Sequence, residues 1–115
     1  MIVEHALLPV RPGLADAFEA AFAEAYPIIA AMPGFGGLSL SRCVERPDSY
    51  LLLVRWERLT DHTEGFRGSP EYQRWRALLH HFYEPFPVVE HFAPVLGDEV
   101  FPASAAVATS APADK

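Results

Sequence analysis

The feature that most restricts the fold of this chain is a run of apolar residues near its middle, Tyr50-Leu51-Leu52-Leu53-Val54. The run lies in a predicted strand over residues 50–57, which follows a turn at Arg46-Pro47-Asp48-Ser49. A strand with one face in water alternates apolar and polar residues, and this run does not alternate. We therefore expect both faces of this strand to be covered in the folded protein.

The apolar periodicity also predicts two helices. The first opens after Pro12 and ends by residue 32, and Pro27 should kink or restart it because proline has no amide proton to donate. The second is expected in two pieces: a short one and, after Gly68, a longer one that Ser69 caps ahead of a proline at the first helical position.

Three further strands are predicted over residues 2–8, 35–44 and 88–92. The resulting order, β-α-β-β-α-β, is that of a ferredoxin-like α+β fold. Right-handed crossovers place both helices on one face of a four-stranded antiparallel sheet, with the first strand between the third and the fourth. The chain then has no element left to cover the other face of residues 50–54. We expect a second copy to cover it, sheet against sheet; the alternative is a partly exposed sheet.

The length of 115 residues allows one domain, which we place at residues 1–96. Residues 97–115 form a C-terminal tail, and from about residue 103 its alanine-rich composition predicts disorder. The net charge of −6 and the lack of a Lys/Arg stripe argue against nucleic acid and membrane surfaces as partners. A single cysteine and an N-terminus without a basic region favour a cytoplasmic protein.

Several short motifs resemble the antibiotic biosynthesis monooxygenase family over about residues 1–96. They are Val3-Glu4-His5, Met32-Pro33-Gly34-Phe35, Trp56-Glu57-Arg58, Ser69-Pro70-Glu71-Tyr72 and Val89-Glu90-His91. Members of this family are dimeric α+β barrels built from ferredoxin-like protomers, and they include cofactor-independent oxygenases of polycyclic phenols and quinols. The resemblance implies a homodimer through the sheet face, a pocket between the sheet and the helices, and no cofactor.

Two histidines are candidates for catalysis in such a pocket. If Val3, His5 and Leu7 face the helices, the His5 ring points into the pocket and can deprotonate an acidic phenol. The alternative for His5 is a structural role, paired with Glu90 or His91 on the neighbouring strand. His62 begins the second helical segment, near the pocket mouth in the family pattern, and is the second candidate; it can equally be a solvated residue at a helix end.

Aromatic side chains are the candidates for substrate binding, although at helical spacing such residues also form ordinary core. The candidates are Trp56, Phe66, Tyr72 and Trp75. No metal site is predicted, because His80 and Glu84 lie one turn apart without a third ligand. Haem-degrading relatives use an asparagine on the first strand, and this chain contains no asparagine. Whether His80 or His81 binds haem or a metal stays open.

The sequence holds no phosphate-binding loop and no dinucleotide fingerprint. The function that the resemblance implies is a cofactor-independent monooxygenase that oxidises a small aromatic substrate, similar to a phenol or a quinol. The alternative is a dimer of the same fold that binds a small hydrophobic ligand, or serves as an accessory protein, without catalysis.

Overall fold

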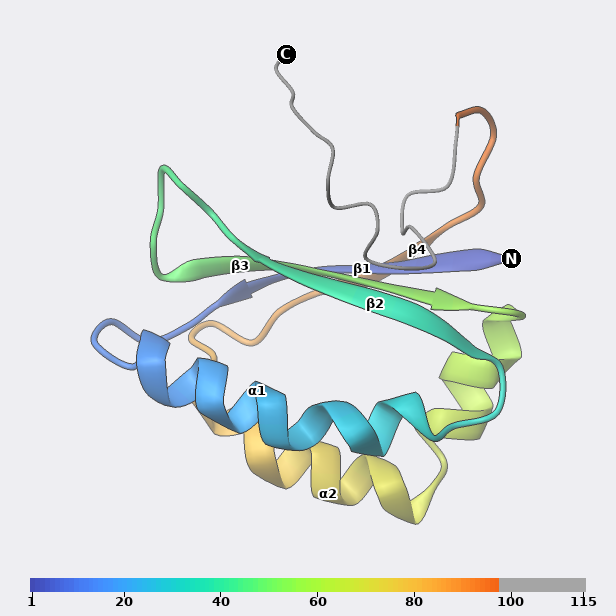
Figure 1. Cartoon of the computed structure of the whole chain (residues 1–115), viewed down its shortest axis with the longest axis horizontal. Coiled ribbons are helices and arrows are strands. Elements are labelled where there is room, and N and C mark those ends of the chain that lie inside the picture. Colours follow the sequence, from blue (N-terminus) through green and yellow to red (C-terminus); the bar gives the residue numbers. More distant parts are fainter. Residues whose placement is uncertain (98–115) are drawn as a thin grey trace.

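The computed structural model describes residues 1–97, in which four antiparallel strands form one sheet (Figure 1). The order β2-β3-β1-β4 places the first strand between the third and the fourth, as predicted. The prediction of a disordered tail concerns residues outside the described part. The strands are β1 (Ile2–Pro9), β2 (Phe35–Arg42), β3 (Ser49–Trp56) and β4 (Val89–Phe92).

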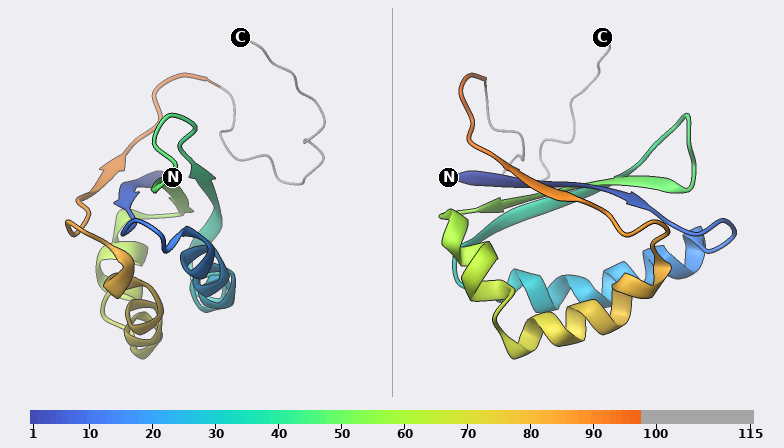
Figure 2. Two further views of the ribbon diagram at one scale, coloured as in Figure 1. Left: turned by 90° about the vertical axis from the view of Figure 1, so that its left-hand side faces the viewer. Right: turned by 180° about the vertical axis from the view of Figure 1, so that it is seen from behind.

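The helical segments all lie on one face of this sheet, with α1 and α2 side by side (Figure 2). None of the helices within residues 1–97 is long and apolar enough to cross a membrane. The segments are α1 (Ala15–Ala30), the short π-helix η1 (Asp61–Phe66), α2 (Pro70–Leu79) and the short 3-10 helix η2 (His80–Phe82).

Pro27 and Gly68, at which the sequence predicts interruptions of the helices, have different effects in the structure. Of the two outcomes predicted for Pro27, the restart is wrong, because α1 continues through this exposed residue, and the kink stays a prediction. Buried Ala25 and Ile29 flank Pro27 and pack on the core, and packing of this kind outweighs a local loss of one hydrogen bond. Gly68, in contrast, does separate η1 from α2: a Cβ at this position would lie 2.6 Å from the carbonyl oxygen of Glu64. The predicted cap is confirmed, since the Ser69 hydroxyl accepts a hydrogen bond from the Tyr72 N–H at 3.1 Å.

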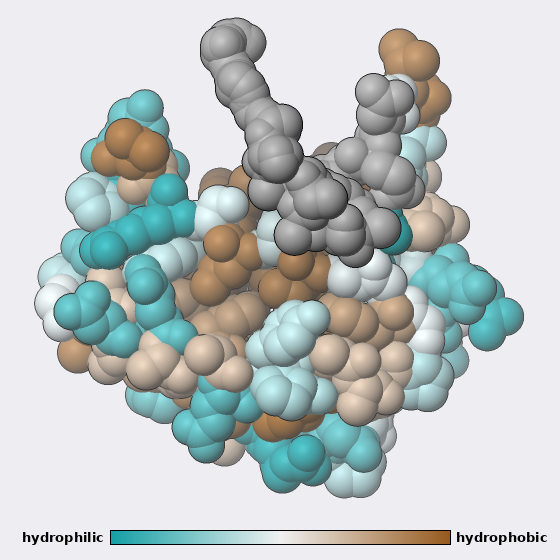
Figure 3. All heavy atoms as spheres, in the orientation of Figure 1, coloured by the Kyte–Doolittle hydropathy of each residue, from teal (hydrophilic) through white to brown (hydrophobic). Residues whose placement is uncertain are grey.

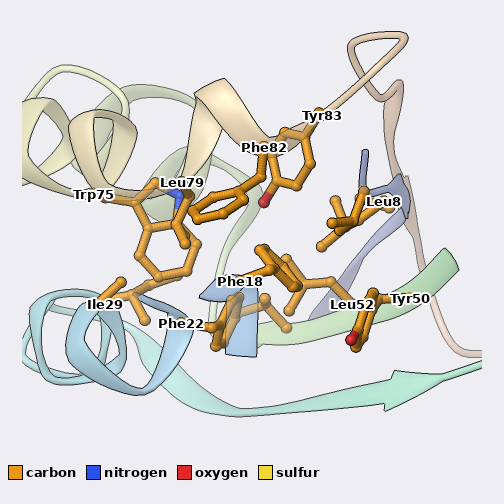
Figure 4. Close-up of a cluster of buried hydrophobic side chains, with 14 of the residues drawn as sticks. Leu8, Phe18, Phe22, Ile29, Tyr50, Leu52, Trp75, Leu79, Phe82 and Tyr83 are labelled. Atoms are coloured by element: carbon orange, nitrogen blue, oxygen red, sulfur yellow. The ribbon is translucent and has the colours of Figure 1, made fainter. Parts of the chain in front are cut away.

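The apolar run in β3 divides between two environments. Tyr50, Leu52 and Val54 are buried under the helices, whereas Leu51 and Leu53 point to the opposite face and are half-buried. The core between sheet and helices is largely aromatic (Figure 4).

No helix within residues 1–97 covers the opposite face, which we call the open face (Figures 1 and 2). Leu7 and Phe92 on this face are about half exposed, at 52% and 51%. Figure 3 shows strongly hydrophobic side chains at the surface near the level of the sheet, and a mixture of hydrophilic and weakly hydrophobic ones over the helices below.

Candidate functional site

The register of β1 decides which of its polar residues faces the helices. Glu4 is paired with Val54 and His5 with Leu53, so the two neighbours point to opposite faces. Glu4 is the buried one, at 6% exposure. The expected orientation, in which His5 faces the helices, is therefore wrong. The strand instead turns Glu4, Ala6 and Leu8 toward the helices. This orientation buries the apolar side chains of Ala6 and Leu8, at 1% and 3% exposure, together with Glu4.

The Glu4 carboxylate lies within a buried polar cluster formed by four elements, which we call the Glu4 cluster: Glu4, Trp56, His62 and His91. The Trp56 indole Nε1–H donates a hydrogen bond to Glu4 Oε1 at 2.9 Å, and His62 Nε2 lies 3.4 Å from the same oxygen. Oε2 accepts no hydrogen bond within residues 1–97. Burial raises the pKa of Glu4 to about 6, although the Trp56 hydrogen bond and the charge of Arg67 act to lower it.

The second half of the cluster is a pair of imidazoles. His62 Nδ1 and His91 Nε2 are 2.8 Å apart, and the His62 ring stacks on the Trp56 indole with centroids 5.5 Å apart and an interplanar angle of 19°. Burial lowers the pKa of His62 to about 3, and burial likewise lowers the pKa of His91; the nearby charge of Arg67 adds to both effects. Near neutral pH, both rings are therefore uncharged while Glu4 is largely ionised.

One arrangement of protons suits all three titratable groups. His91 Nε2–H donates to His62 Nδ1, which leaves the His62 proton on Nε2, directed at the Glu4 carboxylate. The negative charge of Glu4 thus faces two N–H groups, from Trp56 and His62. These fixed dipoles compensate in part for the water that the buried carboxylate has lost.

A tight turn holds the helix that carries His62. The Asp61 carboxylate accepts a hydrogen bond from the Arg58 N–H at 2.9 Å, which fixes the start of η1 beside the end of β3. Gly34 packs directly against this carboxylate, with a φ of +84°. A side chain at residue 34 would overlap Asp61, so the glycine permits the close approach. The Asp61 hydrogen bond and the close approach of Gly34 thereby hold η1 in the position in which His62 stacks on Trp56.

The Glu4 cluster borders a cavity of about 200 Å³ between the sheet and the α2 side of the helical layer. Three of the four predicted substrate-binding aromatics, Phe66, Tyr72 and Trp75, line it. Trp56 is fully buried behind Glu4 and is not part of the wall. The other lining residues are Glu4, Ala6, Leu8, Leu52, His62, Arg67, His80, Tyr83, Phe86, Pro87 and Val89.

His5 lies outside this cavity. Its ring meets Phe92 edge-on on the open face, with centroids 5.5 Å apart. Glu90 is its register partner on β4, but His5 Nδ1 is buried without a hydrogen bond within residues 1–97. The ring instead borders a second hollow, of about 330 Å³, with Val3, Leu53 and Phe92 among its walls.

The residues considered for a metal site, His80, His81 and Glu84, do not form one with a third ligand within residues 1–97. His80 lines the first cavity and packs edge-on against Phe86, with centroids 4.9 Å apart. Within residues 1–97, no three His, Cys, Asp or Glu side chains are grouped so that they could hold a metal ion.

Two members of the site, Glu4 and Arg67, were not among the sequence candidates. One sequence feature points to Glu4: it is an acidic residue at a position that alternates with Ala6 and Leu8 in an apolar segment, which is consistent with burial on the same face. For His91, the sequence suggests only a role as a partner for His5. Its contact with His62, which lies 29 residues earlier in the sequence, depends on the pairing of β4 with β1 and on the position of η1.

Comparison with known proteins agrees with this architecture. Residues 1–78 match the family described as antibiotic biosynthesis monooxygenase. The uncharacterized protein YczJ of Bacillus subtilis is 59% identical over 95 residues, which are 83% of this chain and 100% of that protein. A solved structure from Bordetella bronchiseptica, assigned to the antibiotic biosynthesis monooxygenases, is 38% identical, with a TM-score of 0.79 over 83% of this chain and 97% of that chain. SnoaB of Streptomyces nogalater, a cofactor-independent oxygenase, shares the fold at 19% identity, with a TM-score of 0.73 over 84% of this chain and 94% of that chain.

Proposed function

The chain belongs to the antibiotic biosynthesis monooxygenase family, and we propose that it oxidises a small phenol- or quinol-like substrate with O₂ and without a cofactor. The observation that carries this proposal is the Glu4 carboxylate, which is buried and borders an aromatic cavity, and whose pKa this burial raises to about 6. A group that ionises close to the working pH is well suited to act as a general base.

A reaction of this kind needs no cofactor if the substrate itself supplies the electrons. A hydroquinone and O₂ give a hydroxyquinone and water: one ring C–H becomes C–OH, both hydroxyls become carbonyls, and the second oxygen atom leaves as water. All four electrons come from the ring. The contribution of the protein is to remove a phenolic proton, since the phenolate gives up electrons to O₂ more readily than the phenol does.

We assign the base role to Glu4, in place of His5. Glu4 Oε2 has no hydrogen bond within residues 1–97 and belongs to a side chain of the cavity wall, so it is the oxygen available to a phenol. Trp56 and His62 hold the other oxygen and keep the carboxylate in place. His62 is thus a positioning residue. The rings of Phe66, Tyr72 and Trp75 provide walls that stack on an aromatic substrate and exclude water.

The predicted homodimer belongs to the same proposal. The open face presents half-exposed Leu7 and Phe92, half-buried Leu53 and the unpartnered His5 Nδ1. A second copy packed sheet against sheet would cover these residues, and we expect it to bury more than about 1,000 Å² in total. His5 would then be an interface histidine.

Oxygen uptake tests the catalytic proposal. The protein is mixed with a panel of hydroquinones in ¹⁸O₂, and both the oxygen consumed and the label in the product are measured. We expect one labelled oxygen atom in the quinone for each O₂ consumed, at a rate well above that of the substrate alone. If an aromatic compound binds to the protein and no uptake exceeds the background, the protein is a ligand-binding member of the family and the proposal is wrong.

A further inference from the structure

The opening of the first cavity carries a cationic side chain that the proposed reaction has not used. Arg67 follows η1, lines the cavity and is exposed, so it stands where the cavity meets solvent. Its guanidinium forms no ion pair within residues 1–97. Its charge nevertheless reaches the Glu4 cluster, because it lowers the pKa of Glu4, of His62 and of His91.

The volume of the cavity limits what it can hold. A buried apolar cavity of about 150 Å³ is enough to bind benzene, whereas pockets for drug-sized ligands begin at about 300 Å³. The cavity here has about 200 Å³. One substituted ring fits this volume, and three or four fused rings do not.

We propose that the substrate is a single-ring phenol or quinol that carries an acidic group, and that Arg67 binds this group at the mouth of the cavity. This inference rests on the proposed function, whose substrate class it narrows. A guanidinium presents paired N–H donors that match the two oxygens of a carboxylate. The free oxygen of Glu4 then receives the hydroxyl group of the same ring.

The two charges of the cavity favour one orientation of such a ligand. Glu4 is acidic, so it repels an anionic substituent from the inner end of the cavity. Arg67, at the outer end, attracts it. A neutral phenol lacks this guidance and would bind more weakly. Arg67 is therefore a specificity residue, with no direct part in moving the proton.

The test uses ligands that bind without turnover, measured by isothermal titration calorimetry under nitrogen. The probes are 4-hydroxybenzoate and its neutral methyl ester, and for size 6-hydroxy-2-naphthoate and anthracene-2-carboxylate. We expect the wild-type protein to bind 4-hydroxybenzoate about tenfold more tightly than the ester, the ratio that one charge-assisted contact gives. The anthracene acid should bind least.

Arg67→Gln should reduce the preference for the acid over the ester to less than about twofold while the affinity for the ester stays the same. Arg74→Gln is the matched control, because Arg74 is exposed on α2 and does not line the cavity. Circular dichroism checks that both variants fold.

Equal binding of acid and ester to the wild-type protein would overturn the inference. So would a preference that survives in Arg67→Gln, tighter binding of the anthracene acid, or no binding of any probe. Binding is measured without oxygen, so these outcomes are separate from failure of the oxidation itself, which appears as a lack of oxygen uptake.

Discussion

Glu4 and His5 are adjacent in β1, and the two faces of the sheet give them opposite surroundings. On the helix face, Glu4 receives the Trp56 N–H at 2.9 Å and lies beside His62. On the open face, His5 Nδ1 is buried and has no hydrogen bond within residues 1–97. Buried polar atoms in folded proteins nearly always have a partner. On the helix face, one Glu4 oxygen is thus held by Trp56 and the side chain borders a cavity, whereas the buried His5 Nδ1 on the open face has no hydrogen-bond partner within residues 1–97.

The same comparison assigns different proposed roles to the two faces of the sheet: catalysis to the helix face and dimerisation to the open face. The helix face combines an ionisable carboxylate with an aromatic cavity, which are the requirements of the proposed oxidation. Within residues 1–97, the open face combines an apolar surface with the unpartnered Nδ1 of His5, which are features of an interface. Substitutions that are chemically the same on the two faces should therefore have different effects.

The largest difference is expected between Glu4→Gln and Glu90→Gln. Both replace a carboxylate by an amide, but Glu90 lies on the open face beside His5. Loss of a positioned base lowers a rate by about 10²–10⁴-fold, so we expect that fall in kcat for Glu4→Gln and a change of less than about threefold for Glu90→Gln. Oxygen uptake with the best hydroquinone measures both. Similar rates in the two variants would remove Glu4 from the reaction.

Leu53→Arg should prevent formation of the proposed dimer. An arginine in the middle of an apolar interface leaves an unpaired charge without water, which costs several kcal/mol. Analytical ultracentrifugation at micromolar concentration should show a dimer for the wild-type protein and a monomer or aggregate for the variant. A monomeric wild-type protein would mean that the open face is not an interface between copies of this chain.

The effects of Leu52→Ala and Leu53→Ala on the free energy of unfolding provide a further comparison of the two faces of the sheet. Leu52 is 4% exposed in the aromatic core, so its truncation should lower the free energy of unfolding by about 2–5 kcal/mol at any protein concentration. Leu53→Ala should cost less in dilute solution, and its cost should grow with concentration if, as proposed, the folded chain dimerises through the open face. Urea unfolding at two concentrations tests this. Equal, concentration-independent losses would contradict the assignment of faces.

The last comparison concerns acid stability, because the pKa shifts of two groups of the Glu4 cluster act on it in opposite directions. His62 has its pKa lowered from 6.5 to about 3, so between these values the unfolded chain binds a proton that the folded chain does not, and stability rises with pH. Glu4 has its pKa raised from 4.5 to about 6, so stability falls with pH over that interval. His62→Gln should flatten the rise in stability between pH 3 and 6.5, and Glu4→Gln should steepen it between pH 4.5 and 6. Unfolding free energies measured across this pH range test both changes. A variant whose pH dependence equals that of the wild-type protein, or changes in the opposite direction, would contradict the pKa shift of the residue replaced.

The fold could be predicted from the sequence because its signals are local. The turn before residue 49, the Ser69 cap and the prolines mark element boundaries within a few residues of sequence. The helix does not restart at Pro27, because the packing of Ala25 and Ile29 on the core, which depends on residues far along the chain, carries α1 through it. Local signals thus identify where elements begin and end better than they identify what happens inside them.

The site was harder to predict, for a reason visible in β1. Val3 and Leu7 are apolar in one phase of the strand, and Ala6 and Leu8 are apolar in the other, so alternation does not decide which phase is buried. The choice between Glu4 and His5 depends on this phase alone. The aromatic wall was easier, because Phe66, Tyr72 and Trp75 share one side of the helical segments whichever way the strand faces.

Burial should bring the pKa of Glu4 close to neutral pH, and a direct titration of this carboxyl group tests that expectation. Carboxyl carbons of ¹³C-labelled glutamate are followed by NMR as the pH changes, and the signal absent from Glu4→Gln identifies Glu4. We expect a midpoint at about pH 6 in the wild-type protein. The midpoint should be higher in Trp56→Phe, because the indole N–H stabilises the ionised form. A midpoint at the ordinary value of 4.5, or one that does not move in Trp56→Phe, would contradict the account.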